Sequence, residues 1–561
     1  MIHRAATPPD RVRTSTVAAA AIILLYTLLS LYRLGAVYAP ETCWTSGGKG
    51  DQISLDLGGE REIGSLSFYL GVYENRRFRV EVGSGSPIRW QELPQITMGR
   101  VFQWGRADIR AKGQYIRLTT LDQSTEIREL IVTDSQGQAV CPVNRAEYPT
   151  LFDEDWMYPG YSSYQSGTVF DESFFARTAY EYLHGLRSYE DTHPPLGKLM
   201  LVPGIACFGM TPFGWRIGSL VAGTLLLILL WAFCCRLFDD PWISVGVLAL
   251  MALDLMHFTQ SRLGQVDAFL VLFMTGMSYF MFRYQEVMAE GDGKKSWRYL
   301  WASGIAFGLA ISCKWSGFYG GLGLALIWAS IQIRQIRKGR IGWKELGRTC
   351  MVCCASFVAV PLLLYLLSYI PYVAMDKELG FWERVAKNQI NMFRYHSQLD
   401  GSHASASRWF QWPMLIRPVR LFRRWAGNGD LETLALMGNP AFWWPGLAML
   451  LGSLWRLTER PEGGRRLAFL LTSYLAPLLP WIFIGRYSFL YHYYPSLPFL
   501  ALIMGWWASD KGKWGRRCLW VCVAASAVLG VLFYPVIAGL PVPGEYVARW
   551  LEWLPTWDFT S

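Results

Sequence analysis

Ionisable side chains that could carry chemistry stand at the edges of apolar runs in this chain, where charge is costly and usually functional. Asp171 and Glu172 are adjacent in the stretch VFDE. The stretch EDTHPPLGK, Glu190 to Lys198, adds Asp191 and His193 directly in front of another apolar run. We therefore treat these four residues as candidate catalytic groups, although a helix N-cap with a first-turn acid would also explain Asp171 and Glu172.

Basic residues in or beside later apolar runs accompany these acids. Arg262 lies in HFTQSRLGQVD, Lys314 in CKWSG and Arg486 in IGRYSFLYHYYP. A carboxylate can remove a proton from an acceptor hydroxyl, and arginine or lysine can neutralise a phosphate as it leaves. This combination predicts transfer of a group from a lipid phosphate. A donor with a single phosphate can be managed by cations alone, so no metal ion and no other cofactor is required.

We divide the residues expected to bind the donor phosphate into first and supporting candidates. Arg262, Lys314 and Arg486 are the first candidates, and Lys198, Arg216, His492 and Gln260 are the supporting ones.

Two helices must position the acids. Residues 168–185 place Phe174, Phe175 and Tyr182 at helical spacing, which predicts an amphipathic helix at the outer membrane interface. Pro194 and Pro195 cannot continue a helix but can begin one, so we expect a helix from Leu196 to Phe208.

The composition places these helices in a membrane. The chain has 561 residues, of which 52% are hydrophobic and 17% charged, whereas soluble proteins carry about 25% charged residues. Apolar runs of about 20 residues recur, each able to cross ~30 Å of hydrocarbon. Eleven spans are expected, near residues 16–34, 216–236, 242–260, 265–284, 299–313, 316–333, 349–371, 442–457, 467–484, 491–508 and 517–537.

The distribution of basic residues predicts the orientation. The strongly basic short loops all fall on one side of these spans, which is the positive-inside pattern. The net charge of +10 therefore indicates topology and not nucleic-acid binding. The run 16–34 ends without a small-x-small cleavage site, so it predicts a first membrane span and not a signal peptide. We expect a multi-pass cell-membrane protein with a cytoplasmic N-terminus and its catalytic residues on the outer side.

The segment 38–145 differs from the rest, because short alternating strands are separated by turn residues; they include ISLDLGG (53–59), IGSLSFYLG (63–71), RFRVEVG and IRELIVTD. It predicts a β-sandwich that is similar in pattern to discoidin or galactose-binding jelly rolls. Such a module could bind glycan or an acceptor protein, or act as a rigid spacer. Cys43 and Cys141 bracket it, and an oxidising exterior would favour a disulfide between them.

Seven motifs then indicate a family. VFDE, DTHPPLGK, FTQSRLGQVDAF, CKWSG, WFQWPMLIRP, GNPAFWW and RYSFLYHYYPSLPFL occur in this order. Together they resemble the protein O-mannosyltransferases, GT-C-type membrane enzymes that use polyprenyl- or dolichyl-phosphate-mannose. The resemblance covers Thr168 to about Ala538, most of the chain.

The resemblance implies a fold, a reaction and residue roles. The fold would be mainly α and polytopic, of GT-C type with about eleven transmembrane helices and an inserted β-sandwich. The reaction would be inverting transfer of mannose from the lipid phosphate to Ser or Thr hydroxyls of exported proteins. Asp171 would be the general base, with Glu172 supporting it. His193 would begin the family's HPP motif and Asp191 would be the second acid of that loop.

The chain departs from the family pattern in two places. The outer loop 374–440 is too short for the MIR domain of eukaryotic members, which suits the bacterial branch. The β-sandwich precedes the acidic pair, so acceptor selection is open. The expected organisation is tail and first span 1–37, sandwich 38–145, first outer loop 146–215, spans 216–373, outer loop 374–440, spans 441–540 and outer tail 541–561.

Two other classes of protein compete with this interpretation. A related lipid-phosphate-sugar transferase could modify a lipid, as lipid A aminoarabinose transferases do, or a cell-wall glycan. A transporter or receptor would place ionisable groups near mid-span and contain paired repeats, neither of which the sequence has. The sequence leaves the sugar, the acceptor and a homodimer open.

Overall fold

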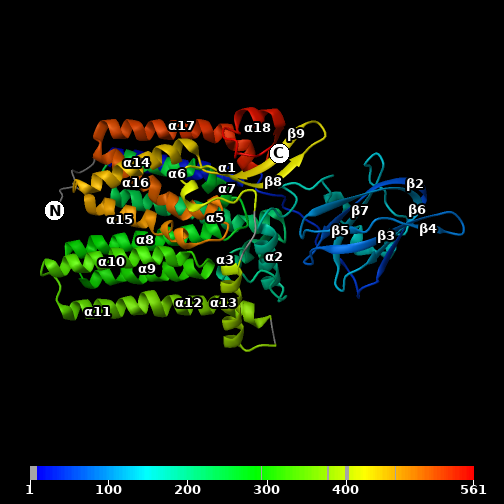
Figure 1. Ribbon diagram of the computed structural model, residues 1–561, viewed down its shortest axis with the longest axis horizontal. Coiled ribbons are helices and arrows are strands. Elements are labelled where there is room, and N and C mark those ends of the chain that lie inside the picture. Colours follow the sequence, from blue (N-terminus) through cyan, green and yellow to red (C-terminus); the bar gives the residue numbers. More distant parts are fainter. Residues whose placement is uncertain (1–8, 292, 376–377, 399–402, 462) are drawn as a thin grey trace. The chain divides into compact units, whose positions relative to one another are not determined.

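The computed structural model describes residues 9–291, 293–375, 378–398, 403–461 and 463–561, and the chain divides into two compact units. One unit combines Met1–Arg33, Gly185–Pro203 and Arg216–Ser561, and the other combines Leu34–His184 and Gly204–Trp215. The first unit is helical and the second contains a β module (Figure 1). Each unit is described by itself below.

The predicted apolar runs form helices, because a helix satisfies its backbone hydrogen bonds within one segment, as the membrane interior requires. The longer helices are α1 (Pro9–Leu31), α5 (Pro212–Leu237), α6 (Pro241–Ala252), α8 (Asp267–Glu290), α9 (Gly293–Cys313), α10 (Gly317–Arg337), α11 (Trp343–Cys354), α12 (Val360–Ala374), α14 (Pro440–Thr458), α15 (Gly464–Leu475), α16 (Leu497–Asp510) and α17 (Gly512–Ala538). Shorter helices are α3 (Leu196–Leu199), α4 (Val202–Phe208), α7 (Leu255–Ser261) and α18 (Gly544–Trp550).

Every run predicted to span the membrane contains helix, but the count of eleven spans is not confirmed. Among the described residues, five helical segments are long and apolar enough to cross a membrane: Asp10–Leu31, Pro212–Leu237, Trp343–Ala374, Gly464–Phe483 and Gly512–Ala538. The pair α6 and α7 is bent by 60° and would make a sixth. The other helices are too short or insufficiently apolar by the same criterion. The chain is nevertheless a multi-pass membrane protein.

Helices α8 and α9 form an antiparallel pair that brings two charged residues together (Figure 1). Helix α8 begins at Asp267, and α9 ends at Cys313, one residue before Lys314. Since the start of one helix meets the end of its antiparallel neighbour, these two side chains meet at the same end of the pair.

The β-rich module is confirmed, but its strands are longer than the sequence suggested. Residues 53–59 and 63–71, predicted as two strands, belong to one long strand whose pairing register shifts between Asp56 and Arg61. A bulge of this kind bends a strand, and the sheet surrounds one apolar core. The strands are β1 (Trp44–Thr45), β2 (Gln52–Leu70), β3 (Arg76–Ser84), β4 (Arg89–Glu92), β5 (Ile96–Met98), β6 (Trp104–Thr120) and β7 (Glu126–Asp134), in the order β1-β7-β2-β6-β3-β4 with β5 paired to β3.

The predicted disulfide is wrong, because Cys43 and Cys141 are both free thiols. Both flank strand β7, but at separate points along it. Trp44, next to Cys43, pairs with Ile127, whereas the N–H of Val140, next to Cys141, donates to the carbonyl of Val132. Extending these antiparallel registers by one residue places Cys43 opposite Arg128 and Cys141 opposite Ile131. Three residues of strand cover about 10 Å, which is beyond the Cα spacing of ~4–7 Å that a disulfide needs.

The predicted loop 374–440 contains helix α13 (Phe381–Gln398) and the hairpin β8 (Val419–Trp425) and β9 (Asp430–Leu436). Strand β10 (Pro541–Pro543) pairs with β9 to complete a small sheet. Helix α13 buries Arg384 and Asn388, while Trp382 and Phe393 are 69% and 65% exposed. The helix therefore buries two polar side chains and exposes two large apolar ones.

Candidate active site

The stretch EDTHPPLGK folds around a buried carboxylate, that of Glu190. Its Oε1 lies 3.0 Å from Nδ1 of His193 and accepts from the backbone N–H of Thr192 at 2.9 Å. Nζ of Lys198 pairs with its other oxygen and also donates to the carbonyls of Glu190 and His193, each at 2.9 Å. Burial works to raise the pKa of Glu190, but the charges of Lys198 and His193 outweigh it and hold the pKa well below its usual range.

This network changes two expectations about the loop. Lys198 is only 1% exposed and is committed to Glu190 and two carbonyls, so it is an internal counterion of the loop and not a ligand of the donor phosphate. Glu190, which the sequence analysis did not select, organises the loop. The helix predicted from Leu196 to Phe208 begins and ends where expected, but a turn at Met200 and Leu201 divides it into α3 and α4. A Cβ on Gly197 would lie 2.6 Å from Cγ1 of Val266, which explains a glycine at this point.

A second group of residues gathers around Lys314. Its Nζ lies 3.0 Å from Oδ1 of Asp267 and 5.2 Å from the centre of the Tyr491 ring. The ring of His492 packs against Tyr491 at 4.6 Å and against Trp481 at 4.1 Å. The structure therefore brings Lys314 and His492 together through an aromatic cluster, as the sequence analysis expected of their common site.

His396 of α13 joins this group and was missed by the sequence analysis. Its Nε2 lies 2.8 Å from the carbonyl of Thr192, and its ring contacts His193 at 5.4 Å between centres. Burial and the charges of His193 and Arg486 lower the pKa of His396 to about 4, so the ring is neutral at pH 7. Nε2 then carries the proton, and Nδ1 is a buried acceptor without a partner among the described residues. Arg384, Asn388 and His396 are spaced by multiples of four residues, and this placement on one helix face is the sequence signal that could have pointed to His396.

Arg486 lies at the edge of a large cavity. Its guanidinium is 6.0 Å from the ring centre of Trp481, and both residues line a cavity of about 790 Å³. Trp409, Trp412 and Tyr487 supply further aromatic wall. A cavity that combines a cation with aromatic surface can hold a ligand with an anionic group and an apolar portion.

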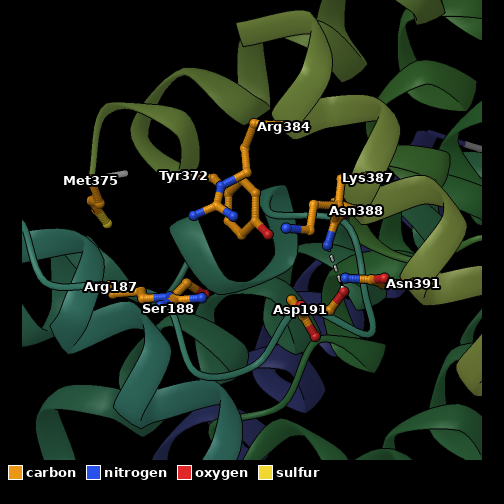
Figure 2. A pocket seen from close by; sticks show the side chains of 9 residues that line it. All are labelled: Arg187, Ser188, Asp191, Tyr372, Met375, Arg384, Lys387, Asn388 and Asn391. Atoms are coloured by element: carbon orange, nitrogen blue, oxygen red, sulfur yellow. Dashed lines mark hydrogen bonds between the residues drawn. The ribbon is translucent and has the colours of Figure 1, made fainter. Parts of the chain in front are cut away.

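Asp191 belongs to a smaller polar pocket of about 90 Å³. Figure 2 shows Asp191 across from side chains of α13, and Nδ2 of Asn388 donates to its backbone carbonyl at 2.8 Å. Burial and the neighbouring charge of Glu190 raise the pKa of Asp191. The pocket is lined by Arg187, Ser188, Asp191, Tyr372, Met375, Arg384, Lys387, Asn388 and Asn391.

Arg262 has a different role from the one expected. Its guanidinium is fully buried and donates to the carbonyls of Ser30 at 2.7 Å and of Tyr32 and Arg33 at 2.8 Å each. Helix α1 ends at Leu31, so Arg262 satisfies the carbonyls that a helix end leaves without partners. Its expected place at the donor phosphate is therefore wrong.

Gln260 and Arg216, two of the supporting candidates for the donor phosphate, are also buried. Gln260 is fully buried, and both polar atoms of its side chain are without partners among the described residues. Arg216 is fully buried near the start of α5. Neither residue lines a described cavity next to Lys314 or Arg486.

The acidic pair lies in the other unit, at the start of α2 (Glu172–Leu183). Phe170 has φ of +53°, a conformation that is uncommon outside glycine and often marks functional sites. Asp171 follows at the N-cap and is half-buried, while Oε2 of the fully buried Glu172 accepts from the N–H of Val169 at 2.9 Å. The proximity of Asp171 to Lys314 and Arg486 stays a prediction, because the acids and the cations belong to different units.

The fold is of the GT-C type. The Saccharomyces cerevisiae protein O-mannosyltransferase Pmt1-Pmt2 complex bound to the sugar donor has a similar fold, with a TM-score of 0.62 and 16% sequence identity over 70% of this chain and 89% of that one. The family model for dolichyl-phosphate-mannose-protein mannosyltransferase matches residues 202–375. The model for the C-terminal four-transmembrane region of protein O-mannosyltransferase matches residues 381–557.

Two bacterial relatives extend the similarity over most of the chain. The polyprenol-phosphate-mannose–protein mannosyltransferase of Mycobacterium tuberculosis is 26% identical over 69% of this chain and 86% of its own length. The Corynebacterium glutamicum protein of the same name is 25% identical over 71% of this chain and 89% of its own. The chain belongs to the protein O-mannosyltransferase family, as its seven motifs had indicated.

Proposed function

We propose that the chain transfers mannose from polyprenyl-phosphate-mannose to Ser or Thr hydroxyls of exported proteins. The family and the names of the bacterial relatives support this choice of donor and acceptor. The structural observation that carries it is an aromatic cavity of about 790 Å³ lined by Arg486, whose charge, with that of Lys314, lowers the pKa of His396. A lipid phosphate linked to a sugar needs both the cations and the apolar wall.

The donor would be held by residues of the helical unit. Within the described ranges Lys314 pairs with one carboxylate, that of Asp267, and Arg486 lines the cavity, so both are suited to a phosphate. Nδ1 of His396 is a neutral acceptor that could receive a hydrogen bond from a sugar hydroxyl, which a phosphate dianion cannot supply. His193, held by Glu190, would act as a positioning residue because its ring packs against His396.

The proposed reaction is a single inverting displacement. The acceptor oxygen forms a bond to the anomeric carbon while the bond from that carbon to the phosphate oxygen breaks. Asp171 takes the hydroxyl proton, and Glu172 fixes the backbone just before it. The lipid phosphate leaves with the bonding electrons, and Lys314 and Arg486 stabilise its added charge. Asp191, with a raised pKa in its polar pocket, would line the approach to this centre.

The proposal includes an orientation. The basic short loops support a cytoplasmic N-terminus and an active site at the outer face of the cell membrane. Acceptors that reach this face are exported chains, which agrees with the proposed substrate class.

The test is transfer by the purified full-length chain. Radiolabelled polyprenyl-phosphate-mannose is incubated with Ser- and Thr-containing peptides, and the label in the peptide and the anomeric configuration of the product are measured. We expect an α-linked mannosyl peptide, made only when a hydroxyl is present. Label that enters a lipid or glycan fraction and never a peptide would instead favour the alternative transferase.

A further inference from the structure

Three acidic side chains of the unit that contains the β module lie together. Glu129 lies on β7, and Asp153 and Glu154 lie in the segment that follows the sheet. One carboxylate oxygen from each lies within 4.8 Å of those of the other two. All three belong to the same compact unit.

Thr42, which precedes β1, adds a fourth oxygen. Its Oγ1 lies 2.9 Å from Oδ1 of Asp153 and 3.2 Å from Oε2 of Glu154. Backbone N–H groups of Glu41 and Thr42 also donate to Oε2 of Glu154, at 2.8 and 3.1 Å. The group therefore joins segments from before, within and after the sheet.

Glu129 supplies an independent sign of a ligand. Its side chain is fully buried, and its Oε2 accepts from the N–H of Glu154 at 3.0 Å. Its Oε1 is buried and has no hydrogen-bond partner in the described part of the chain. The neighbouring Arg128 directs its guanidinium to Glu126, to the carbonyl of Pro40 and to Tyr180 instead. A buried carboxylate without a counterion is strongly unfavourable.

We infer that Glu129, Asp153, Glu154 and Thr42 bind one Ca²⁺ ion. The ligands are all oxygen atoms, which favours a hard cation over zinc. Ligand distances of about 2.3–2.6 Å place opposite oxygens up to about 5 Å apart, and this spacing accommodates the measured limit. The cation would give the buried oxygen of Glu129 the partner that it lacks.

The ion would have a mechanical consequence for the acidic pair. Asp153 and Glu154 begin the stretch of chain that leads to Phe170 and Asp171. Fixing that start to β7 would order the segment between the sheet and α2. This role is separate from phosphate neutralisation, so it does not depend on the proposed transfer.

The experiment measures binding and stability of the purified full-length chain in detergent. Bound ions are removed with a chelator, the chelator is removed by dialysis, and Ca²⁺ is titrated by calorimetry while thermal unfolding is followed. Tb³⁺ is a second probe, because Trp156 lies two residues from Glu154 and can sensitise its luminescence. We expect one Ca²⁺ per chain, a higher unfolding temperature with Ca²⁺, and displacement of Tb³⁺ by Ca²⁺.

Matched variants distinguish a specific Ca²⁺ site from nonspecific attraction of Ca²⁺ to acidic residues. Glu129→Gln keeps the side-chain shape and is expected to weaken Ca²⁺ binding by about tenfold or more, since it removes a charged ligand. Asp153→Asn changes an exposed ligand and serves if Glu129→Gln does not fold. Glu92→Gln, an exposed acid elsewhere in the module, should bind as the unchanged chain does. Absence of Ca²⁺ binding at millimolar concentration, or equal affinity in Asp153→Asn and Glu92→Gln, would overturn the inference.

Discussion

At the scale of residues, Lys314 is the cation best placed for a phosphate. It is nearly buried and held by Asp267, and the Tyr491 ring limits its movement. A pre-positioned charge in a site of low dielectric loses little reorganisation energy when a phosphate gains charge. The pair with Asp267 therefore fixes the cation in place for its proposed partner.

Lys314→Gln is expected to lower transfer by about 10²–10³-fold, because a donor to the leaving phosphate is removed. Lys314→Arg should retain a larger part of the activity. The measurement is kcat and KM for the lipid donor, with Lys344→Gln, at an exposed position of α11, as the control. Equal kinetics for Lys314→Gln and the unchanged chain would remove this residue from the site.

Asp171→Asn is expected to reduce transfer by about 10²–10⁴-fold while the protein stays folded, since the amide cannot accept the hydroxyl proton. The measurement is peptide labelling together with the apparent unfolding temperature. Glu92→Gln, an exposed acid of the same unit, controls for loss of charge alone. Near-normal transfer by Asp171→Asn would reject the base assignment.

Acid pH should destabilise the chain through His396. Its folded pKa is about 4, against about 6.5 in an unfolded chain, so between these values only the unfolded state binds the proton. Stability is full above pH 6.5 and falls as the pH drops toward 4. Burial also lowers the pKa of the adjacent His193, which adds to the loss in the same direction. Glu190, with a lowered pKa, contributes only at more acidic pH.

The check compares unfolding temperatures at pH 7 and pH 4.5. His396→Gln should lose less stability over this interval than the unchanged chain, and the exposed His403→Gln should lose the same amount. Identical acid sensitivity of His396→Gln and the unchanged chain would contradict the assignment.

At the scale of elements, the sequence predicted where helices and strands occur better than how they end. Pro194 and Pro195 correctly placed the start of a helix at Leu196, because proline acts locally. Alternation predicted two strands where β2 is one, since a bulge between Asp56 and Arg61 depends on pairing with β6. Likewise Arg262 looked like an interfacial cation, and only the tertiary contact with the end of α1 reveals its role.

Arg262→Met should lower the stability of the chain by roughly 2–4 kcal/mol, because three carbonyls lose a charged donor at once. The loss should be visible as a lower unfolding temperature in detergent. Any activity that remains should keep the KM of the lipid donor. A normal unfolding temperature with a raised donor KM would return Arg262 to the phosphate site.

At the scale of the whole molecule, the order of the seven motifs correctly indicated the family. The contacts within the candidate site could not be predicted in the same way, because they join segments that are distant in the sequence. The sequence analysis missed His396 because its partners, Thr192 and Arg486, are distant in the sequence. It missed Glu190 because the ion pair with Lys198 forms only when the loop folds. The prediction of a Cys43–Cys141 disulfide was wrong for the same reason. Cysteines at the two ends of a module need not lie at the same point along β7.

Removal of divalent ions should separate two properties of the chain. With EDTA, transfer at moderate temperature should change little, because the proposed phosphate partners are Lys314 and Arg486. The unfolding temperature of the β module should fall, because the inferred Ca²⁺ is lost. Parallel assays of labelling and unfolding check both outcomes, and a strict Mn²⁺ requirement for transfer would contradict the monophosphate mechanism.

Helix α13 combines exposed aromatic side chains with residues that face the candidate site. Trp382 and Phe393 face outward, while Arg384 and His396 reach inward from the same helix. Because these rings and His396 belong to one helix, a shift of the rings would also move His396 relative to Thr192. Reconstitution in vesicles of differing headgroup packing should consequently tune turnover without any change in the sequence.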